Sequence, residues 1–474
     1  MRKNKAVTLL LCGVLALSFS ACGGNNEQPS EPQNTQNEES KEPQETQTAD
    51  EQKTEPEKGE VQNVVFWHSF SGATGEALES IIKSYNEGRG NEKGIQVELV
   101  YQGYEGTDKV TLAYQTKDTQ NAPDINVGLT STIPAVMDMD WTVPAERFLN
   151  DSNSEITKSS FYEQLQRACS YEGQMVGIPF SNSIPVLYYN KAILEEAGFD
   201  APPETMDELI EYVEALTIKD GDKVTRYGLN MQVKRYQLVE FCARQKEDGF
   251  FGDNEGGRTA PMTKIIAGED GTLKAFLEKL QELNETGGYK YIEDNINEEF
   301  AQGLSAMVIM SSSRMGTLDG LMPGEYMTAN LPKVNADDTG SAAVGGSCLN
   351  IFDRGNEARL NAAWDVIQYC VSPENQYIFA TASGYIPVNV DCENLDEMKK
   401  HYEENPQYKV ALEQMKNAVV TAQEPLDLTY NEINGIITEV MLEFCQGNLS
   451  VDEAVQKIVD QCNASLDEYH EMNS

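Results

Sequence analysis

The stretch that decides the fold reads GIPFSNSIPVLYYNK and runs from Gly177 to Lys191. A polar trio, Ser181 to Ser183, lies between two prolines, and the apolar run that follows has the length and composition of a β-strand. Because proline lacks the N–H donor that a strand ladder needs, we expect the trio to cross between two packed units, with exposed hydroxyl and amide groups, rather than to lie inside a sheet. The residues after Lys191 predict a short amphipathic helix that ends at Gly198, where a left-handed residue is expected.

Strands and helices alternate on both sides of this crossing. Helices are predicted over residues 74–86, 108–115, 205–216, 273–286, 406–422, 431–445 and 451–468, and strands over 64–67, 95–101, 123–128, 186–189 and 306–310. A second, Gly/Ser-rich crossing is predicted from Val344 to Ile351. This alternation indicates an open α/β sheet, whose ligand sites lie beyond the carboxyl ends of its strands. The polar residues expected at such ends are His68, Ser69, Tyr104 and Thr130.

The N-terminus has the three regions of an export signal: early basic residues, an apolar run from Ala6 to Phe19, and small residues before Cys22. The apolar run is too short to span a bilayer comfortably, which favours cleavage. The segment from Leu17 to Gly23 resembles a bacterial lipoprotein signal. This resemblance implies a signal peptide over residues 1–21 and a lipid on Cys22, and the alternative is an ordinary secretory signal with a chance cysteine.

Residues 22–61 form a segment rich in Glu, Gln, Asn, Thr, Ser and Pro that contains no aromatic residue. Such a composition cannot bury enough apolar surface to offset the entropy of ordering the chain, so we expect a disordered acidic tether. A flexible chain of this length spans roughly 35 Å, enough to hold a domain clear of a membrane, and a merely solubilising role is equally compatible.

The net charge is −41, from 36 basic and 77 acidic residues, which would repel nucleic acid phosphates and anionic lipids. We therefore expect no nucleic-acid partner. Of nine cysteines, removal of Cys12 with the signal and Cys22 with the anchor leaves seven. None forms a Cys-x-x-Cys pair, so we expect mostly buried free thiols and no metal or cofactor. One disulfide is the alternative for an exported protein.

Seven short motifs occur in a fixed order along the chain after residue 62. They are FWHS at 66–69, GY at 103–104, NAPD at 121–124, IPF with PVLYYNK across 178–191, AM at 306–307, GG at 345–346 and SGYIP at 383–387. Together they resemble the extracellular solute-binding proteins of ATP-driven (ABC) importers, most nearly the glycerol-3-phosphate and sugar-binding group.

The resemblance implies an α/β, two-lobed clamp of the periplasmic-binding-protein type II, with several hinge crossovers. Lobe one is expected to comprise residues 62–177 plus 348–412, and lobe two residues 178–347 plus 413–474. A ligand bound in the cleft between them would stabilise the closed form, which a membrane permease of the importer would then recognise.

The resemblance also implies a set of ligand-binding positions. They are Tyr104, Thr130, Ser183, one of Ser311 or Ser312, Gly346, Tyr385 and Asn434. Thr130 stands where the glycerol-phosphate binders have an acidic residue, and Asn434 stands where they have an arginine that grips the phosphate. Loss of a bidentate guanidinium removes the usual device for phosphate recognition, so the sequence favours a neutral sugar or oligosaccharide.

Each assignment has an alternative. Tyr104 and Tyr385 would otherwise be packing tyrosines, Ser311 to Ser313 a plain helix cap, and Arg235 a surface cation instead of a cleft residue beside Tyr236. His68 is expected to be a structural hydrogen-bonding residue, and all three tryptophans are expected in the core.

The sequence thus predicts a monomeric, non-enzymatic lipoprotein on the outer face of the bacterial cell membrane that captures a carbohydrate for an ABC permease. The alternatives are binding of glycerol-3-phosphate or a glycerophosphodiester by the same mechanism, an exported glycosidase with two carboxylates, and a tethered sensor or adhesin.

Overall fold

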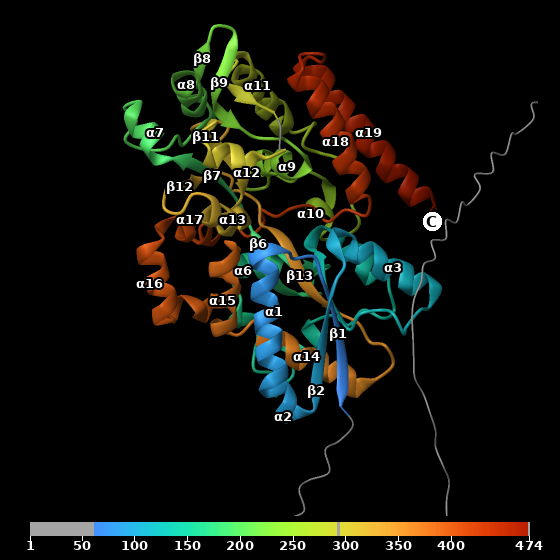
Figure 1. Ribbon diagram of the computed structural model, residues 1–474. Coiled ribbons are helices and arrows are strands. Elements are labelled where there is room, and N and C mark those ends of the chain that lie inside the picture. Colours follow the sequence, from blue (N-terminus) through green and yellow to red (C-terminus); the bar gives the residue numbers. More distant parts are fainter. Residues whose placement is uncertain (1–60, 292–293, 473–474) are drawn as a thin grey trace, which may run out of the picture. The chain divides into compact units, whose positions relative to one another are not determined.

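The computed structural model describes residues 61–291 and 294–472 (Figure 1). The predicted signal peptide, Cys22 and almost all of the predicted tether lie outside these residues. No helix in the described part of the chain is long and apolar enough to cross a bilayer.

The first sheet has five strands in the order β2-β1-β3-β13-β6. They are β1 (Gln62–His68), β2 (Ile95–Tyr101), β3 (Ile125–Leu129), β13 (Gly345–Ile351) and β6 (Ile178–Ser183). β1 pairs in parallel with β2 and β3, and helix α1 (Gly72–Glu87) connects β1 to β2, so the predicted parallel strand-helix-strand unit is confirmed. β13 runs antiparallel to both β3 and β6.

The second sheet has six strands, in the order β10-β9-β11-β7-β12 with β8 added beside β9. They are β7 (Pro185–Asn190), β8 (Ile218–Asp220), β9 (Lys223–Asn230), β10 (Tyr289–Lys290), β11 (Ser305–Ser311) and β12 (Tyr326–Asn330), and a separate hairpin joins β4 (Ser170–Tyr171) to β5 (Gln174–Met175). In Figure 1 this sheet lies in the upper half of the view and the first sheet in the lower half.

Helices surround the strands. Up to β10 they are α2 (Arg89–Lys93), α3 (Gly106–Thr116), α4 (Ile133–Met137), α5 (Glu146–Leu149), α6 (Glu163–Ala168), α7 (Lys191–Glu196), α8 (Met206–Leu216), α9 (Arg235–Ala243), α10 (Asp253–Gly257) and α11 (Thr272–Glu285). After β10 they are α12 (Ile296–Ala301), α13 (Met315–Leu321), α14 (Glu357–Cys370), α15 (Pro373–Ser383), α16 (Asp396–Glu404), α17 (Pro406–Lys416), α18 (Tyr430–Cys445) and α19 (Val451–Met472). Short 3-10 turns are η1 (Gly103–Glu105), η2 (Thr130–Thr132), η3 (Lys158–Ser160), η4 (Ser312–Arg314) and η5 (Val390–Asn394).

The polar trio that was expected to cross between units lies inside β6 instead, so that prediction was wrong. Ser181 to Ser183 pair with β13, and all three side chains are buried. The preceding Pro179 is tolerated because β6 is the edge strand of its sheet. The chain passes from the first sheet to the second at Ile184, between β6 and β7.

The second predicted crossing, Val344 to Ile351, extended too far, because Gly345 to Ile351 form strand β13. The crossing is at Val344, the first residue of the predicted range, which pairs with Gln423 of the connecting segment 417–429 between α17 and α18. Strand pairing places β6 and all of β13 in the first sheet. The expected lobe limits, at residues 178 and 348, would assign β6 and the first three residues of β13 to lobe two. The lobe limits stay a prediction.

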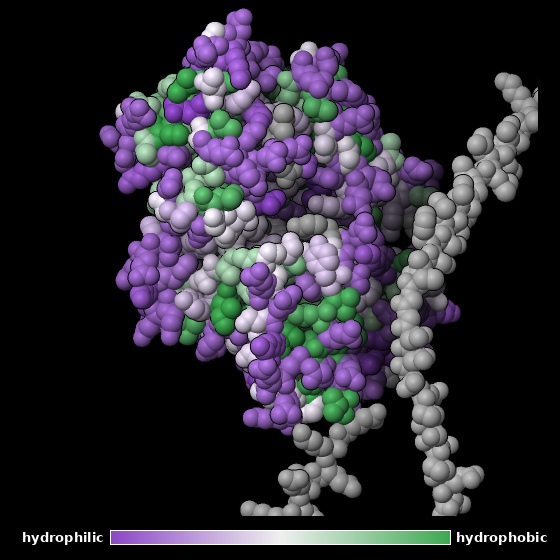
Figure 2. Space-filling view, viewed as in Figure 1, coloured by the Kyte–Doolittle hydropathy of each residue, from purple (hydrophilic) through white to green (hydrophobic). Residues whose placement is uncertain are grey.

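Most of the apolar residues belong to one core that extends over both sheets. Trp67 and Trp364 are buried as predicted, and Trp141 is partly buried against a smaller cluster. All seven cysteines in the described residues are free thiols and six are buried, which confirms the expectation of buried free thiols. The surface is polar over most of the face seen in Figure 2, as a chain with 77 acidic residues requires.

Candidate functional site

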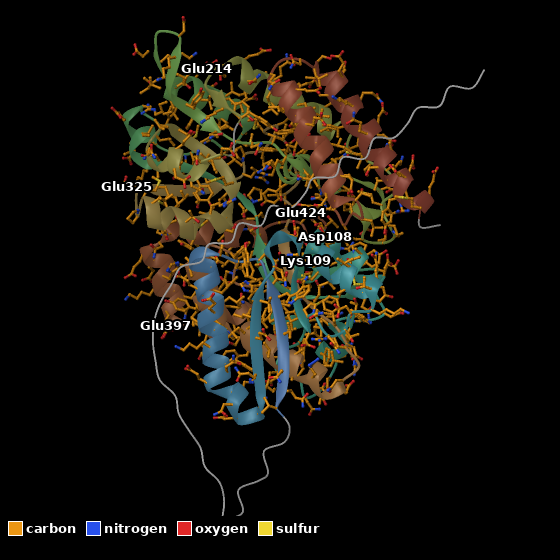
Figure 3. The ribbon with its side chains drawn as sticks, turned by 45° about the vertical axis from the view of Figure 1, so that its right-hand side comes forward. Asp108, Lys109, Glu214, Glu325, Glu397 and Glu424 are labelled. Carbon is orange, nitrogen blue, oxygen red and sulfur yellow. The ribbon has the colours of Figure 1, made fainter. Side chains whose placement is uncertain are left out.

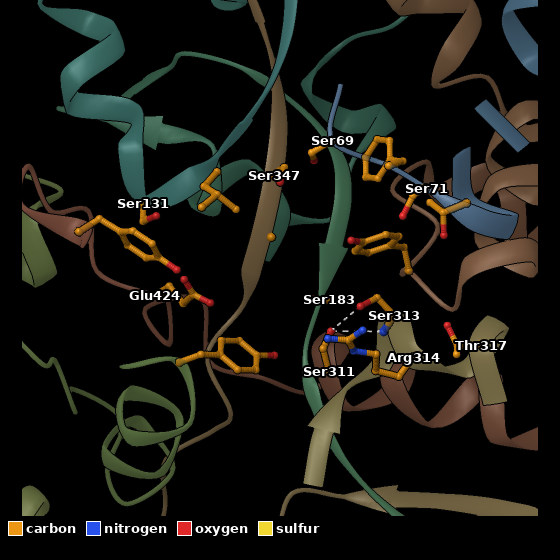
Figure 4. A pocket seen from close by; sticks show the side chains of 17 residues that line it. Ser69, Ser71, Ser131, Ser183, Ser311, Ser313, Arg314, Thr317, Ser347 and Glu424 are labelled. Atoms are coloured by element: carbon orange, nitrogen blue, oxygen red, sulfur yellow. Dashed lines mark hydrogen bonds between the residues drawn. The ribbon is translucent and has the colours of Figure 1, made fainter. Parts of the chain in front are cut away.

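A cavity of about 410 Å³ is lined by residues of both sheets (Figure 4). Nine of its side chains are serines or threonines: Ser69, Ser71, Thr74, Ser131, Ser183, Ser311, Ser313, Thr317 and Ser347. Four are aromatic (Phe70, Tyr236, Tyr385 and Tyr430), and two are charged (Arg314 and Glu424). Hydroxyl groups with aromatic faces and few charges are the lining expected for a small polar ligand.

Strand ends supply much of this lining. Ser69 follows β1 and Ser131 follows β3, at the carboxyl ends of two parallel strands, as an open α/β sheet predicts. From the second sheet, Ser311 is the last residue of β11. Figure 4 shows Ser131 and Glu424 on one side of the cavity and Ser183, Ser311, Ser313 and Arg314 on the other.

Four of the predicted binding residues line the cavity: Ser183, Ser311, Gly346 and Tyr385. Gly346 adopts a φ of 112°, in the region that favours glycine, and a Cβ there would collide with the carbonyl oxygen of Ser181. Glycine at this position therefore lets β13 and β6 approach closely beside the cavity.

Ser311 also has the alternative role that was considered for it. Its Oγ accepts a hydrogen bond from the backbone N of Ser313 at 3.3 Å and lies 2.9 Å from the Ser313 Oγ, so it caps η4 (Figure 4). The Ser311 side chain therefore both caps η4 and lines the cavity.

Three predicted residues are placed differently. Thr130 is fully buried, and its Oγ1 donates to the Gly346 carbonyl oxygen at 3.2 Å, so it supports the wall from behind. Ser312 is also fully buried and is not among the lining residues. Asn434 lies on α18 and does not line the cavity. Tyr430, the first residue of the same helix, lines it instead.

The Tyr104 side chain is not among the described ones, but its neighbour Gly103 lines an adjoining chamber of about 160 Å³. Four residues, Ser69 and Tyr430 among them, line both this chamber and the main cavity. Asp108 lies in the wall of the smaller chamber. The two spaces therefore lie next to each other.

A buried ion cluster supports the wall behind Glu424. Arg235 is only 1% exposed, and its Nε and Nη2 donate to Asp427 Oδ2 at 2.9 and 2.7 Å. Its Nη1 lies 3.5 Å from Glu424 Oε2, and its guanidinium carbon lies 4.6 Å from the centre of the Tyr430 ring. Arg235 is therefore neither a surface cation nor a lining residue. It holds two lining residues in place.

Tyr236 presents a second polar group to the cavity. Its hydroxyl is buried beside the Ser183 and Ser311 hydroxyls, but it makes no hydrogen bond of good geometry within the described residues. Burial raises the pKa of Tyr236 well above its ordinary value, so the group stays a neutral hydroxyl. A buried hydroxyl of this kind favours a ligand that hydrogen-bonds to it.

His68 has the structural role that was predicted. Its Nδ1 accepts a hydrogen bond from the backbone N of Phe70 at 3.3 Å, and burial lowers the pKa of the imidazole. Across residues 61–291 and 294–472, no group of three or more His, Cys, Asp or Glu side chains is arranged to hold a metal ion.

Sequence reasoning missed Glu424, Arg314 and Tyr430. Glu424 follows a region that was predicted to be helical as far as residue 422, whereas α17 ends at Lys416 and an extended segment follows. Pro425, directly after Glu424, is the signal that this segment is not helical.

Comparison with known proteins gives a consistent result. Residues 80–409 match the family described as bacterial extracellular solute-binding protein. The sn-glycerol-3-phosphate-binding periplasmic protein UgpB of Salmonella typhimurium is 25% identical over 429 residues, which cover 86% of this chain and 93% of the relative. The protein of the same name from Pectobacterium atrosepticum is 24% identical over 427 residues, covering 85% and 91%.

Solved structures show the same fold. The cyclic alpha-maltosyl-1,6-maltose binding protein from Arthrobacter globiformis superposes with a TM-score of 0.70 at 19% identity, covering 86% of this chain and 100% of that one. UgpB from Mycobacterium tuberculosis, in complex with glycerophosphocholine, gives 0.67 at 18% identity, covering 86% and 99%. These likenesses confirm the predicted two-lobed type II clamp, and with the family match over residues 80–409 they establish that the chain belongs to the bacterial extracellular solute-binding protein family.

Proposed function

We propose that this protein captures a neutral sugar or oligosaccharide in the cleft between its two sheets and delivers it to the permease of an ABC importer. The observation that carries the proposal is the lining of the cavity: nine serines and threonines and four aromatic residues, with a single arginine and a single carboxylate. Tyrosine and phenylalanine faces stack on the apolar faces of sugar rings, while hydroxyls bond to their polar edges.

Phosphate recognition is the second candidate, because the curated relatives are named for glycerol-3-phosphate and Arg314 lines the cavity. Glu424 favours the neutral ligand, because it adds a carboxylate to the same cavity. Asn434, at the position where the resemblance implies a phosphate-gripping arginine, lies outside the lining and supplies no guanidinium. Like charges at close range disfavour a phosphate near Glu424.

The test is a thermal-shift series with glucose, maltose, maltotriose and glycerol-3-phosphate. A ligand that binds only the folded protein stabilises it by about 2.7 kcal/mol at a hundredfold excess over Kd. We expect at least one sugar to raise the Tm and glycerol-3-phosphate to leave it unchanged. The sugar should be recovered intact, as expected of a binding protein and not of a glycosidase. A shift with glycerol-3-phosphate alone would favour the second candidate.

We further propose that the mature protein is anchored by a lipid on Cys22 to the outer face of the cell membrane, where residues 22–61 tether the clamp as a monomer. Support comes from the lipoprotein-like signal and from the apolar-poor composition of that segment. In detergent phase partition, the expressed wild type should enter the detergent phase and Cys22→Ser should not. Equal partition of both would contradict the anchor.

A further inference from the structure

We propose that Glu424 sets the ligand specificity of this cleft by accepting hydrogen bonds from sugar hydroxyls and by disfavouring phosphate esters. The inference rests on the proposed carbohydrate-binding function and names the residue that would decide between a neutral and an anionic ligand. Glu424 differs from most acidic residues of the chain because it is only 8% exposed, whereas Glu214, Glu325 and Glu397, which are also labelled in Figure 3, lie on the surface far from it.

The backbone fixes where this carboxylate lies. Glu424 belongs to the extended segment 417–429, and its N–H donates to the carbonyl oxygen of Val344 at 3.2 Å, while the Val344 N–H donates to Ala422 at 3.1 Å. Three residues later, the N–H of Asp427 donates to the carbonyl oxygen of Ser131 at 3.1 Å. The segment is thus bonded to the crossing before β13 and to a strand end of the first sheet.

The ion cluster leaves Glu424 with acceptor capacity toward the cavity. Arg235 makes its two shorter hydrogen bonds to Asp427, and its contact with Glu424 Oε2 is long, at 3.5 Å. Glu424 is a lining residue of the cavity, and its Oε2 is the atom that accepts this long hydrogen bond from Arg235 Nη1. Burial raises the pKa of this carboxyl, and the positive charge of Arg235 behind it limits the increase.

Gly345 leaves the space that the carboxylate occupies. A Cβ at this position would collide with Glu424 Oε1, so any larger residue would displace the carboxylate. In Figure 4 the Glu424 carboxylate lies across the cavity from Arg314, Ser311 and Ser313, which gives the cleft an acceptor side and a donor side. A sugar can bond to both sides, whereas a phosphate would be repelled on the Glu424 side.

The test compares Glu424→Gln with Glu325→Gln by titration calorimetry. The probes are glucose, maltose and maltotriose, together with glucose-6-phosphate and glycerol-3-phosphate. Glu325 is a matched control because it is exposed and undergoes the same loss of charge. Loss of a hydrogen bond to a charged group corresponds to roughly 10- to 100-fold in affinity. We expect Glu424→Gln to weaken sugar binding by that factor and to narrow the preference for sugar over phosphate ester, whereas Glu325→Gln should bind as the wild type does.

Gly345→Ala is the second variant, because it keeps the charge of Glu424 and moves its position. It should also weaken sugar binding, and the double variant should lose little more than either single one. If the wild type binds a sugar and Glu424→Gln binds it equally well, this inference is wrong while the proposed function stands. If the wild type binds none of the sugars, both are wrong.

Discussion

The buried carboxyl of Glu240 shows what a single side chain contributes to the crossing between the sheets. Glu240 is fully buried, its Oε2 accepts a hydrogen bond from the backbone N of Ala343 at 2.5 Å, and its Oε1 has no partner in the described part of the chain. Burial, and after it the nearby Glu424, raises the pKa of Glu240 well above the ordinary value of 4.5. The protonated form is therefore the one that the folded state stabilises.

This gives a pH-dependent stability with a definite sign. Because the folded-state pKa is raised, the contribution of Glu240 is fully present below about pH 4.5 and is lost as pH rises through the raised value. Glutamine imitates the protonated side chain, so Glu240→Gln should be more stable than the wild type in urea denaturation at pH 8 and should lose that advantage at pH 5. An advantage of equal size at both values would contradict the assignment, and Glu325→Gln serves as the exposed control.

At the scale of elements, the close pairing of β6 with β13 depends on Gly346. Gly346→Ala adds a Cβ that meets the backbone of Ser181, whereas Gly355 also has a positive φ, of 82°, but open space around it. Gly355→Ala should therefore cost only the strain of its backbone conformation, about 1 kcal/mol. Gly346→Ala should cost about 1–3 kcal/mol more, the usual range for overpacking. Equal melting temperatures for the two variants would contradict the close approach.

Helices and strands with a clear hydrophobic periodicity could be predicted from the sequence. Strands that depend on pairing with a distant strand could not. α1 buries Leu78, Ile81 and Tyr85 on one face, and this amphipathic spacing is visible in the sequence. The position of the trio at 181–183 was wrong because its strand is completed by β13, more than 160 residues away, and the sequence shows no sign of that edge pairing.

The same distinction applies to the site. Ser183, Ser311, Gly346 and Tyr385 could be named from short motifs that keep their order along the chain. Glu424 could not, because its place in the cavity follows from the ion cluster around Arg235 and from the course of an extended segment. Charges that act through tertiary contacts leave no local pattern.

For the whole molecule, the central claim is that the ligand is shared between two lobes. The chain passes between its two sheets at Ile184 and at Val344, and residues 417–429 bond to Val344 and to Ser131, so thin segments connect the halves. A ligand that contacts both halves binds the closed form more tightly than the open form. This difference in affinity determines how far the ligand shifts the molecule toward its closed form.

Small-angle X-ray scattering of the folded protein, with and without the sugar that gives the largest thermal shift, tests this claim most directly. Closure of a clamp on its ligand predicts a smaller radius of gyration in the presence of saturating sugar, at unchanged molecular mass. A radius of gyration that stays the same while the sugar is demonstrably bound would contradict the clamp.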